Sequence, residues 1–124
     1  MVVLVGWLLP LALAAQGPEG ARPLTPPPEY RTWWQDVAAH CDCDPATTFE
    51  HLLWYEVPGE TFACGGPDRC AAGRDADDII LLAHRWVRSV AVVQHEMLHA
   101  LLGGDPQHRH HAWLRYFATP ARGL

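Results

Sequence analysis

Two histidines and a glutamate within five residues, His95, Glu96 and His99, have the types and the spacing for metal chemistry. An α-helix turns once every 3.6 residues, so side chains four residues apart lie one above the other on the same face. His95 and His99 can therefore offer two imidazole nitrogens to one ion, and zinc suits such donors. Glu96 follows the first histidine, so we expect its carboxylate beside the metal, where it can take a proton from water.

These residues require a helix to position them, and the surrounding sequence predicts one. Glycines at positions 103 and 104 supply a C-terminal stop. The competing interpretation is a helix with two solvated histidines, because eight histidines in 124 residues could match the pattern by chance. The helical context favours the metal site, since apolar residues recur at helical spacing at Val87, Val90, Ala91, Leu98, Leu101 and Leu102.

The motif His95-Glu96-Met97-Leu98-His99 resembles the H-E-x-x-H signature of the zincin superfamily of zinc metallopeptidases. That resemblance implies Zn²⁺ as cofactor, His95 and His99 as ligands and Glu96 as general base. It also implies a peptide or protein as substrate. The chain is similar, too, to very small secreted bacterial proteins that carry H-E-x-L-H followed by a D-x-x-H-like segment, here Asp105 to His108.

A catalytic zinc usually takes three protein ligands, so one further donor is expected downstream. In the metzincin branch the pattern would place glycine at Leu102 and the third ligand at Asp105. Leu102 breaks this pattern, and Asp105 followed by proline is typical of a turn. We favour His108, because the glycine pair and the Asp-Pro turn could swing the chain back toward the metal. Asp105 is the second candidate, and the third is either of His110 and His111.

The expected reaction is hydrolysis of a peptide bond. Zinc polarises the carbonyl, while Glu96 takes a proton from water and passes it to the leaving amine. A second donor to the developing oxyanion is expected, from either Tyr116 or His110. If the run Ile79 to Ala83 is an edge strand beside the cleft, it could bind an extended peptide by adding a strand.

Length and composition indicate one small globular domain with a single core. The chain has 124 residues, 49% of them hydrophobic, and a formal net charge of −5. This charge gives no basic field for nucleic acid, and no Lys/Arg cluster indicates a helix that lies on a membrane surface. The oligomeric state is not predicted by the sequence.

The first 28 residues are interpreted as two segments that precede the domain. Residues 1–15 form an uncharged apolar run that ends in small residues. Ala12-Leu13-Ala14 matches an A-x-A cleavage site, which predicts a cleaved secretory signal peptide. A retained anchor is the alternative, but about fifteen residues are short for a bilayer, which needs roughly twenty. Residues 16–28 form a proline-rich segment that we expect to be an extended, solvated linker. The protein is therefore expected to be secreted or periplasmic, without stable membrane insertion after cleavage.

Residues 29–124 are expected to form an α+β domain, a minimal zincin-like arrangement of N-terminal helix, small β-sheet and motif helix. Helical spacing of aromatic and aliphatic residues predicts the first helix from Glu29 to Cys41. A loop is expected between Cys64 and Asp78, and a frayed tail from Thr119. Extended segments are predicted at His51–Val57, Thr61–Ala63 and Ile79–Ala83, and a short closing helix at Ala112–Phe117.

Four cysteines follow the apparent export signal, so we expect two disulfides in an oxidising compartment. A bridge between Cys41 and Cys43 would span a single residue and should be strained. We therefore predict crossed pairing, in which Cys41 and Cys43 bond to Cys64 and Cys70. A second metal site is the alternative, but these spacings differ from the usual two to four residues between zinc-binding cysteines.

The sequence thus predicts a secreted zinc metallopeptidase with Glu96 as base and His95, His99 and His108 on the metal. The rival hypothesis is a non-catalytic zinc-binding or interaction module. The small size keeps that rival open, because little chain remains to build the far wall of a peptidase cleft. A hydrolase acting on a non-peptide amide is a further alternative, since the motif is compatible with both.

Overall fold

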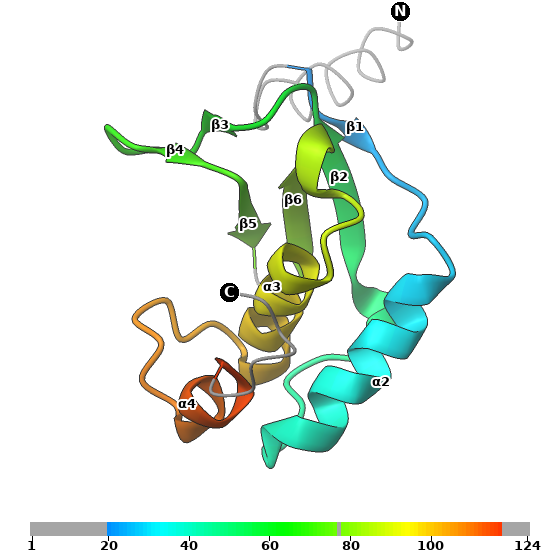
Figure 1. Ribbon diagram of the computed structural model, residues 1–124, viewed down its shortest axis with the longest axis vertical. Coiled ribbons are helices and arrows are strands. Elements are labelled where there is room, and N and C mark those ends of the chain that lie inside the picture. Colours follow the sequence, from blue (N-terminus) through cyan, green and yellow to red (C-terminus); the bar gives the residue numbers. More distant parts are fainter. Residues whose placement is uncertain (1–19, 77, 118–124) are drawn as a thin grey trace, which may run out of the picture.

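The computed structural model describes residues 20–76 and 78–117 of the chain. Its elements form a small α+β domain in which helices pack on one face of a short sheet (Figure 1). The sheet has four strands in the order β1-β2-β6-β5. These are β1 (Arg22–Pro23), β2 (Leu53–Val57), β6 (Ile79–Ala83) and β5 (Ala72–Ala76).

The strand β6 lies at the centre of the sheet, parallel to β2 and antiparallel to β5. Its residues Ile80 to Ala83 are all buried, because side chains of a strand alternate between the two faces and both faces are covered. The sequence analysis predicts peptide binding along Ile79–Ala83 only if this segment is an edge strand. Because β6 lies between β2 and β5, that condition is not met. The sheet has two edge strands, β1 and β5, and β5 contacts the motif helix.

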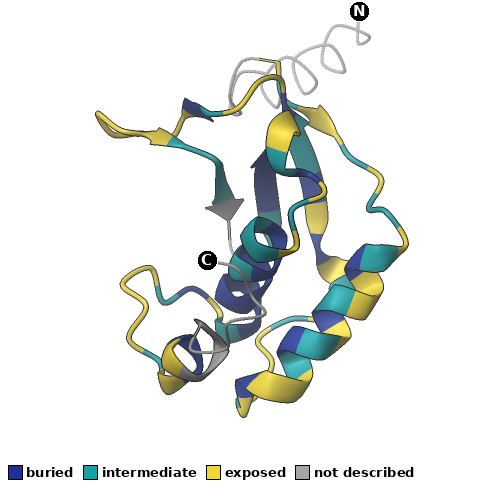
Figure 2. Cartoon of the chain, in the orientation of Figure 1, coloured by how far each residue is buried: buried dark blue, intermediate teal, exposed yellow. Residues whose placement is uncertain are grey.

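Two long helices cover one face of the sheet. These are α2 (Glu29–Cys41) and α3 (Val90–Leu102), and they contact each other (Figure 1). Most of α3 is buried, whereas α2 alternates buried and exposed residues (Figure 2). The main core joins both helices, the sheet and the short helix α4 (His111–Phe117), with Tyr30, Trp34, Val37, Leu52, Trp54, Ile80, Leu82, Val93, Met97, Leu98, Leu101 and Trp113 as its larger members.

Polar contacts within this core fix the two helices relative to each other. The buried Gln94 side chain donates from Nε2 to the Trp33 carbonyl oxygen at 3.1 Å and to Asp36 Oδ2 at 3.3 Å. The Tyr30 hydroxyl donates to the carbonyl oxygen of Val87. Because buried polar groups must find partners, these bonds restrict how α2 packs against α3 and against the segment that precedes it.

A β-hairpin packs against part of the opposite face of the sheet. Its strands are β3 (Phe62–Ala63) and β4 (Arg69–Cys70), which pair antiparallel. Phe62 packs with Leu81 and Ala83, the β6 side chains that point away from the helices. β3 lies within the predicted extended segment Thr61–Ala63. β4 and β5 fall where the sequence predicts only a loop, so the loop prediction is wrong for these two strands.

The proline-rich segment also differs from its prediction. Arg22–Pro23 is exposed and extended, as expected of a linker, but it pairs antiparallel with β2. The Leu24 amide adds a hydrogen bond to the Trp54 carbonyl oxygen at 2.8 Å. A proline is tolerated here because β1 is an edge strand. This part of the linker therefore belongs to the sheet, while residues 1–15 and the tail from 119 lie outside the described residues.

The disulfides join cysteines that are neighbours in the sequence, so the predicted crossed pairing is wrong. Cys41 bonds to Cys43, and Cys64 bonds to Cys70, with Cα atoms 5.2 Å and 6.0 Å apart. Asp42 ends α2 in the left-handed conformation, with φ 53°, and this turn brings its two neighbours together. The hairpin register does the same for Cys64 and Cys70, because it sets β3 against β4.

Candidate metal centre

Three histidines from two segments meet at the C-terminal half of α3. Ligand atoms of His95, His99 and His108 all lie within 4.8 Å of one another. The Nε2 atoms of His95 and His108 are 3.2 Å apart. Two nitrogen ligands of a tetrahedral zinc ion are about 3.3 Å apart, so this spacing fits a shared ion. The structure thus places the two motif histidines and the favoured third candidate in one group that could hold a metal.

The end of α3 orients His99. Gly103 caps the helix in the left-handed conformation, with φ 71°, and the chain turns so that the Gly104 carbonyl faces the buried His99 ring. His99 Nδ1 lies 2.8 Å from this carbonyl oxygen, to which it can donate. A proton on Nδ1 leaves the Nε2 lone pair available to a metal, which is how ligating histidines are usually oriented.

The third histidine of the group, His108, comes from the loop between α3 and α4. It is exposed, and its backbone lies in the left-handed region at φ 56°. The His108 amide donates to the Asp105 carbonyl oxygen at 3.0 Å, which closes a tight turn. The Asp-Pro turn therefore returns the chain toward α3, in agreement with the reason for which the sequence favours His108.

Asp105, the second candidate ligand, has another role in this loop. Its carboxylate accepts hydrogen bonds from the Arg109 amide and the His110 amide, each at 3.0 Å, and from the Trp113 indole at 2.7 Å. These hydrogen bonds lower the pKa of the Asp105 carboxyl, and the bond from the His110 amide has the largest effect. Asp105 is thus the hydrogen-bonding centre of the loop and lies outside the histidine group.

Trp113, which the sequence analysis does not single out, forms one wall of the site. Its ring centroid lies 4.9 Å from that of His95, 4.6 Å from His99 and 4.4 Å from His108. The side chain is buried. The three imidazoles therefore meet against an apolar surface, which reduces access of water from that side.

Glu96 lies beside the cluster and is almost fully buried, with 7% of its surface exposed. Its Oε2 atom is 4.0 Å from Nε2 of His95. Burial raises the pKa of Glu96 to about 7, although the positive charge of Arg74 acts in the opposite direction. A carboxyl with such a pKa can accept and release a proton near neutral pH.

The pKa values of the two motif histidines are lowered rather than raised. Burial, followed by the charges of His99 and His108, lowers the pKa of His95 to about 4. Burial also lowers the pKa of His99, against the hydrogen bond to Gly104. Their imidazoles are therefore neutral at pH 7, the form in which histidine binds metals.

The remaining candidates are not part of the cluster. His110 accepts a hydrogen bond from the Ala112 amide through Nδ1 at 3.0 Å, and its ring stacks on His111. His111 approaches Asp42 at 3.8 Å on the surface. The side chain of Tyr116, a predicted oxyanion donor, lies outside the part of the structure that is described.

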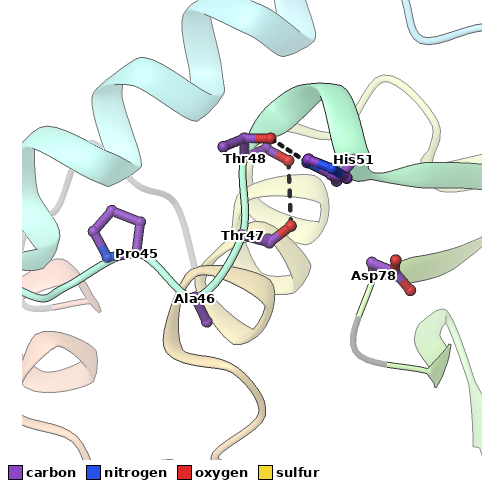
Figure 3. Close-up of a pocket in the computed structure, with 6 residues that line it drawn as sticks. All are labelled: Pro45, Ala46, Thr47, Thr48, His51 and Asp78. Atoms are coloured by element: carbon purple, nitrogen blue, oxygen red, sulfur yellow. Dashed lines mark hydrogen bonds between the residues drawn. The ribbon is translucent and has the colours of Figure 1, made fainter.

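A separate hollow of about 450 Å³ opens near the N-terminal ends of β2 and β6 (Figure 3). Thr48 Oγ1 and His51 Nδ1 form a 2.7 Å hydrogen bond on one side of it, with Asp78 opposite. The Ala46 amide donates to the carbonyl oxygen of Leu101 at 2.8 Å, so this wall is fastened to α3. The lining consists of Pro45, Ala46, Thr47, Thr48, His51 and Asp78, and the hollow is therefore distinct from the histidine cluster.

Comparisons with protein-family models, with curated proteins and with solved structures find no match to this chain. Within residues 20–76 and 78–117, no helix is long and apolar enough to cross a bilayer. The two disulfides are typical of proteins that fold in an oxidising compartment.

Proposed function

We propose that this protein is a secreted zinc-dependent metallopeptidase of the zincin type. The observation that carries the proposal is the buried Glu96 carboxyl, which lies 4.0 Å from a ligand nitrogen of a three-histidine group. Structural zinc sites usually have four protein ligands and leave no position for water, and such sites need no general base. A carboxyl beside three ligands is instead the arrangement expected of a hydrolytic site.

Each residue has a distinct role in this proposal. His95, His99 and His108 hold the ion, and the bound zinc supplies the Lewis acid that polarises the scissile carbonyl. Glu96 takes a proton from the attacking water and delivers it to the leaving amine. Its burial keeps the carboxyl out of bulk solvent, so the proton remains between Glu96 and the reacting atoms.

The edge strand β5 supports a peptide as the substrate. β5 ends the sheet, contacts α3, and carries Arg74 close to the turn at Gly104. An extended peptide could add to this edge by main-chain hydrogen bonds, which would place it beside the motif helix. We therefore propose β5, and not its neighbour Ile79–Ala83, as the strand to which a peptide would add.

The test is substitution of Glu96 by glutamine, followed by measurement of zinc content and of peptide hydrolysis. We expect Glu96→Gln to keep zinc and to lower kcat/KM by about 10²- to 10⁴-fold, the usual contribution of a general base. The control is Glu60→Gln, the same change at an exposed residue, which should leave both properties unchanged.

Two results would contradict the proposal in different ways. Loss of zinc from Glu96→Gln would show that the glutamate is structural. Wild-type protein that binds zinc but hydrolyses no member of a diverse peptide library would favour the alternative, a secreted non-catalytic zinc-binding module.

A further inference from the structure

We propose that Asp105 and Trp113 act together as positioning residues that hold His108 in place as the third metal ligand. The inference rests on the proposed metal site and concerns how the chain builds it. The carboxylate, the indole and the loop between them form one hydrogen-bonded unit around His108.

His108 needs such support more than the other two ligands do. His95 and His99 project from a helix that is fixed by the core, whereas His108 is exposed on a loop. Two non-glycine residues of this loop, Asp105 and His108, have left-handed backbones at φ 55° and 56°. Left-handed backbone is unfavourable for residues that have a Cβ atom, so other interactions must offset this cost if His108 is to remain in place.

Asp105 supplies these interactions through its backbone and its side chain. The Asp105 carbonyl oxygen accepts from the His108 amide, and the two carboxylate oxygens accept from the amides of Arg109 and His110. Hydrogen bonds to an ionised acceptor are stronger than neutral ones. One residue thus holds the His108 amide and the two amides that follow it, which restricts the positions that the His108 imidazole can reach.

Trp113 extends this support from the backbone to the imidazole rings. Its indole N–H donates to Asp105 Oδ2 at 2.7 Å, which fixes the orientation of the ring. The same ring lies within 4.4 to 4.9 Å, centroid to centroid, of all three histidines. Trp113 is buried in the main core, so its hydrogen bond to Asp105 joins the loop to the packed interior of the domain. Loops are usually more mobile than the elements they connect, and this bond therefore restrains the loop.

The test measures zinc affinity by competition with a chromophoric chelator, with the visible spectrum of bound Co²⁺ as a report on ligand geometry. We expect Asp105→Asn to weaken zinc binding about 10- to 100-fold, the usual effect of losing a group that orients a ligand. Trp113→Phe should give a smaller loss, because the two backbone donors remain. Asp44→Asn, the same change at an exposed turn residue, is the control and should have no effect.

A double-mutant cycle separates positioning from a general effect on the fold. His108→Ala should weaken zinc binding more than either substitution of Asp105, by asparagine or by alanine. In the His108→Ala background, Asp105→Asn should cause no further loss, because the ligand that it positions is gone. If Asp105→Asn does not fold, Trp113→Phe is carried through the same cycle.

Several outcomes would overturn the inference. Unchanged zinc affinity in Asp105→Asn would show that the carboxylate is not needed. An equal loss with and without His108 would show a general effect on the domain, and a loss larger than that of His108→Ala would make Asp105 itself the ligand. Peptide hydrolysis does not enter these measurements, so an inactive but zinc-binding protein would refute the proposed activity and leave this inference standing.

Discussion

Burial changes the protonation of the motif residues in opposite directions. It lowers the pKa of His95 and raises that of Glu96, because in both cases the charged form loses its hydration. At neutral pH the result is neutral imidazoles beside a carboxyl that can exchange a proton. One physical cause, the position of these residues on the inner side of α3, therefore acts on both the candidate ligands and the proposed base.

The carboxyl of Glu56, on β2, should make the stability of the fold depend on pH. His84 Nδ1 lies 2.8 Å from Glu56 Oε2, and Arg22 Nε lies 3.2 Å from Oε1. The hydrogen bond from His84, more than the charge of Arg22, lowers the pKa of Glu56 in the folded protein. A lowered pKa stabilises the fold above the pKa of the unfolded chain, and this contribution is lost as the pH falls through the folded value.

We therefore expect Glu56→Gln to lower the free energy of unfolding at pH 7 by about 0.5–1 kcal/mol, since both partners are largely exposed. The difference from wild type should shrink as the pH falls below 4. Urea denaturation of both proteins at a series of pH values measures it. A difference that stays constant from pH 7 to pH 3 would show that the ion pairs do not contribute.

Residue spacing predicts part of the site and leaves out the rest. His95, Glu96 and His99 follow from one helical turn, which is a local property of the sequence. His108 is reached through recognisable turn residues, so it is predicted, though with three competitors. The roles of Asp105 and Trp113 depend on how the irregular loop folds back on the helix, and the Asp105 contacts follow no helical or strand period.

At the scale of elements, the end of α3 connects the helix to the site. Gly103 has φ 71°, and a Cβ atom added there would lie 3.0 Å from the Cβ of Ala46. Left-handed backbone is readily available only to glycine, so this position controls where the helix stops. The carbonyl that orients His99 belongs to the next residue, Gly104, and its position depends on that stop.

Gly103→Ala should lower the free energy of unfolding by about 1–2 kcal/mol, the cost of left-handed backbone for a residue with a Cβ. It should also weaken zinc binding, because the Gly104 carbonyl would shift from His99. Gly66→Ala is the matched control, since a Cβ there meets nothing within 4 Å. Denaturation curves and zinc titrations compare the two, and equal effects at both positions would contradict the account.

Periodicity predicts the helices and the central strand but not the edge of the sheet. The apolar spacing of α2 and α3 and the run Ile79–Ala83 are strong signals, because their partners in the core are numerous. The sequence of β5, AGRDA between positions 72 and 76, has low strand propensity, and its conformation depends on pairing with β6. The same holds for Arg22–Pro23, which becomes a strand only because β2 offers a free side.

At the scale of the whole molecule, the domain is a single helix layer on a short sheet, with a disulfide at each of two turns. The Cys41–Cys43 bridge lies at the end of α2, and the Cys64–Cys70 bridge closes the hairpin on the other face. Neither bridge joins distant parts of the chain. The helices and the sheet are therefore held together by the core and its polar contacts, without a covalent link between them.

This arrangement predicts a simple result from disulfide mapping. Glu50, Glu56 and Glu60 lie between the two pairs of cysteines. After denaturation without reductant, cleavage on the C-terminal side of glutamate should separate the Cys41–Cys43 pair from the Cys64–Cys70 pair. Mass spectrometry would identify the two fragments, and fragments that remain linked until reduction would instead support crossed pairing.

The central claim is that α3 and the following loop form one zinc site. The most direct measurement is the metal content of the purified domain by elemental analysis, for wild type and for His99→Ala, prepared without chelators. We predict about one zinc per chain in wild type, as for a site with three histidine ligands, and its loss in the variant. Wild-type protein that contains no zinc and takes up none on titration would contradict the account.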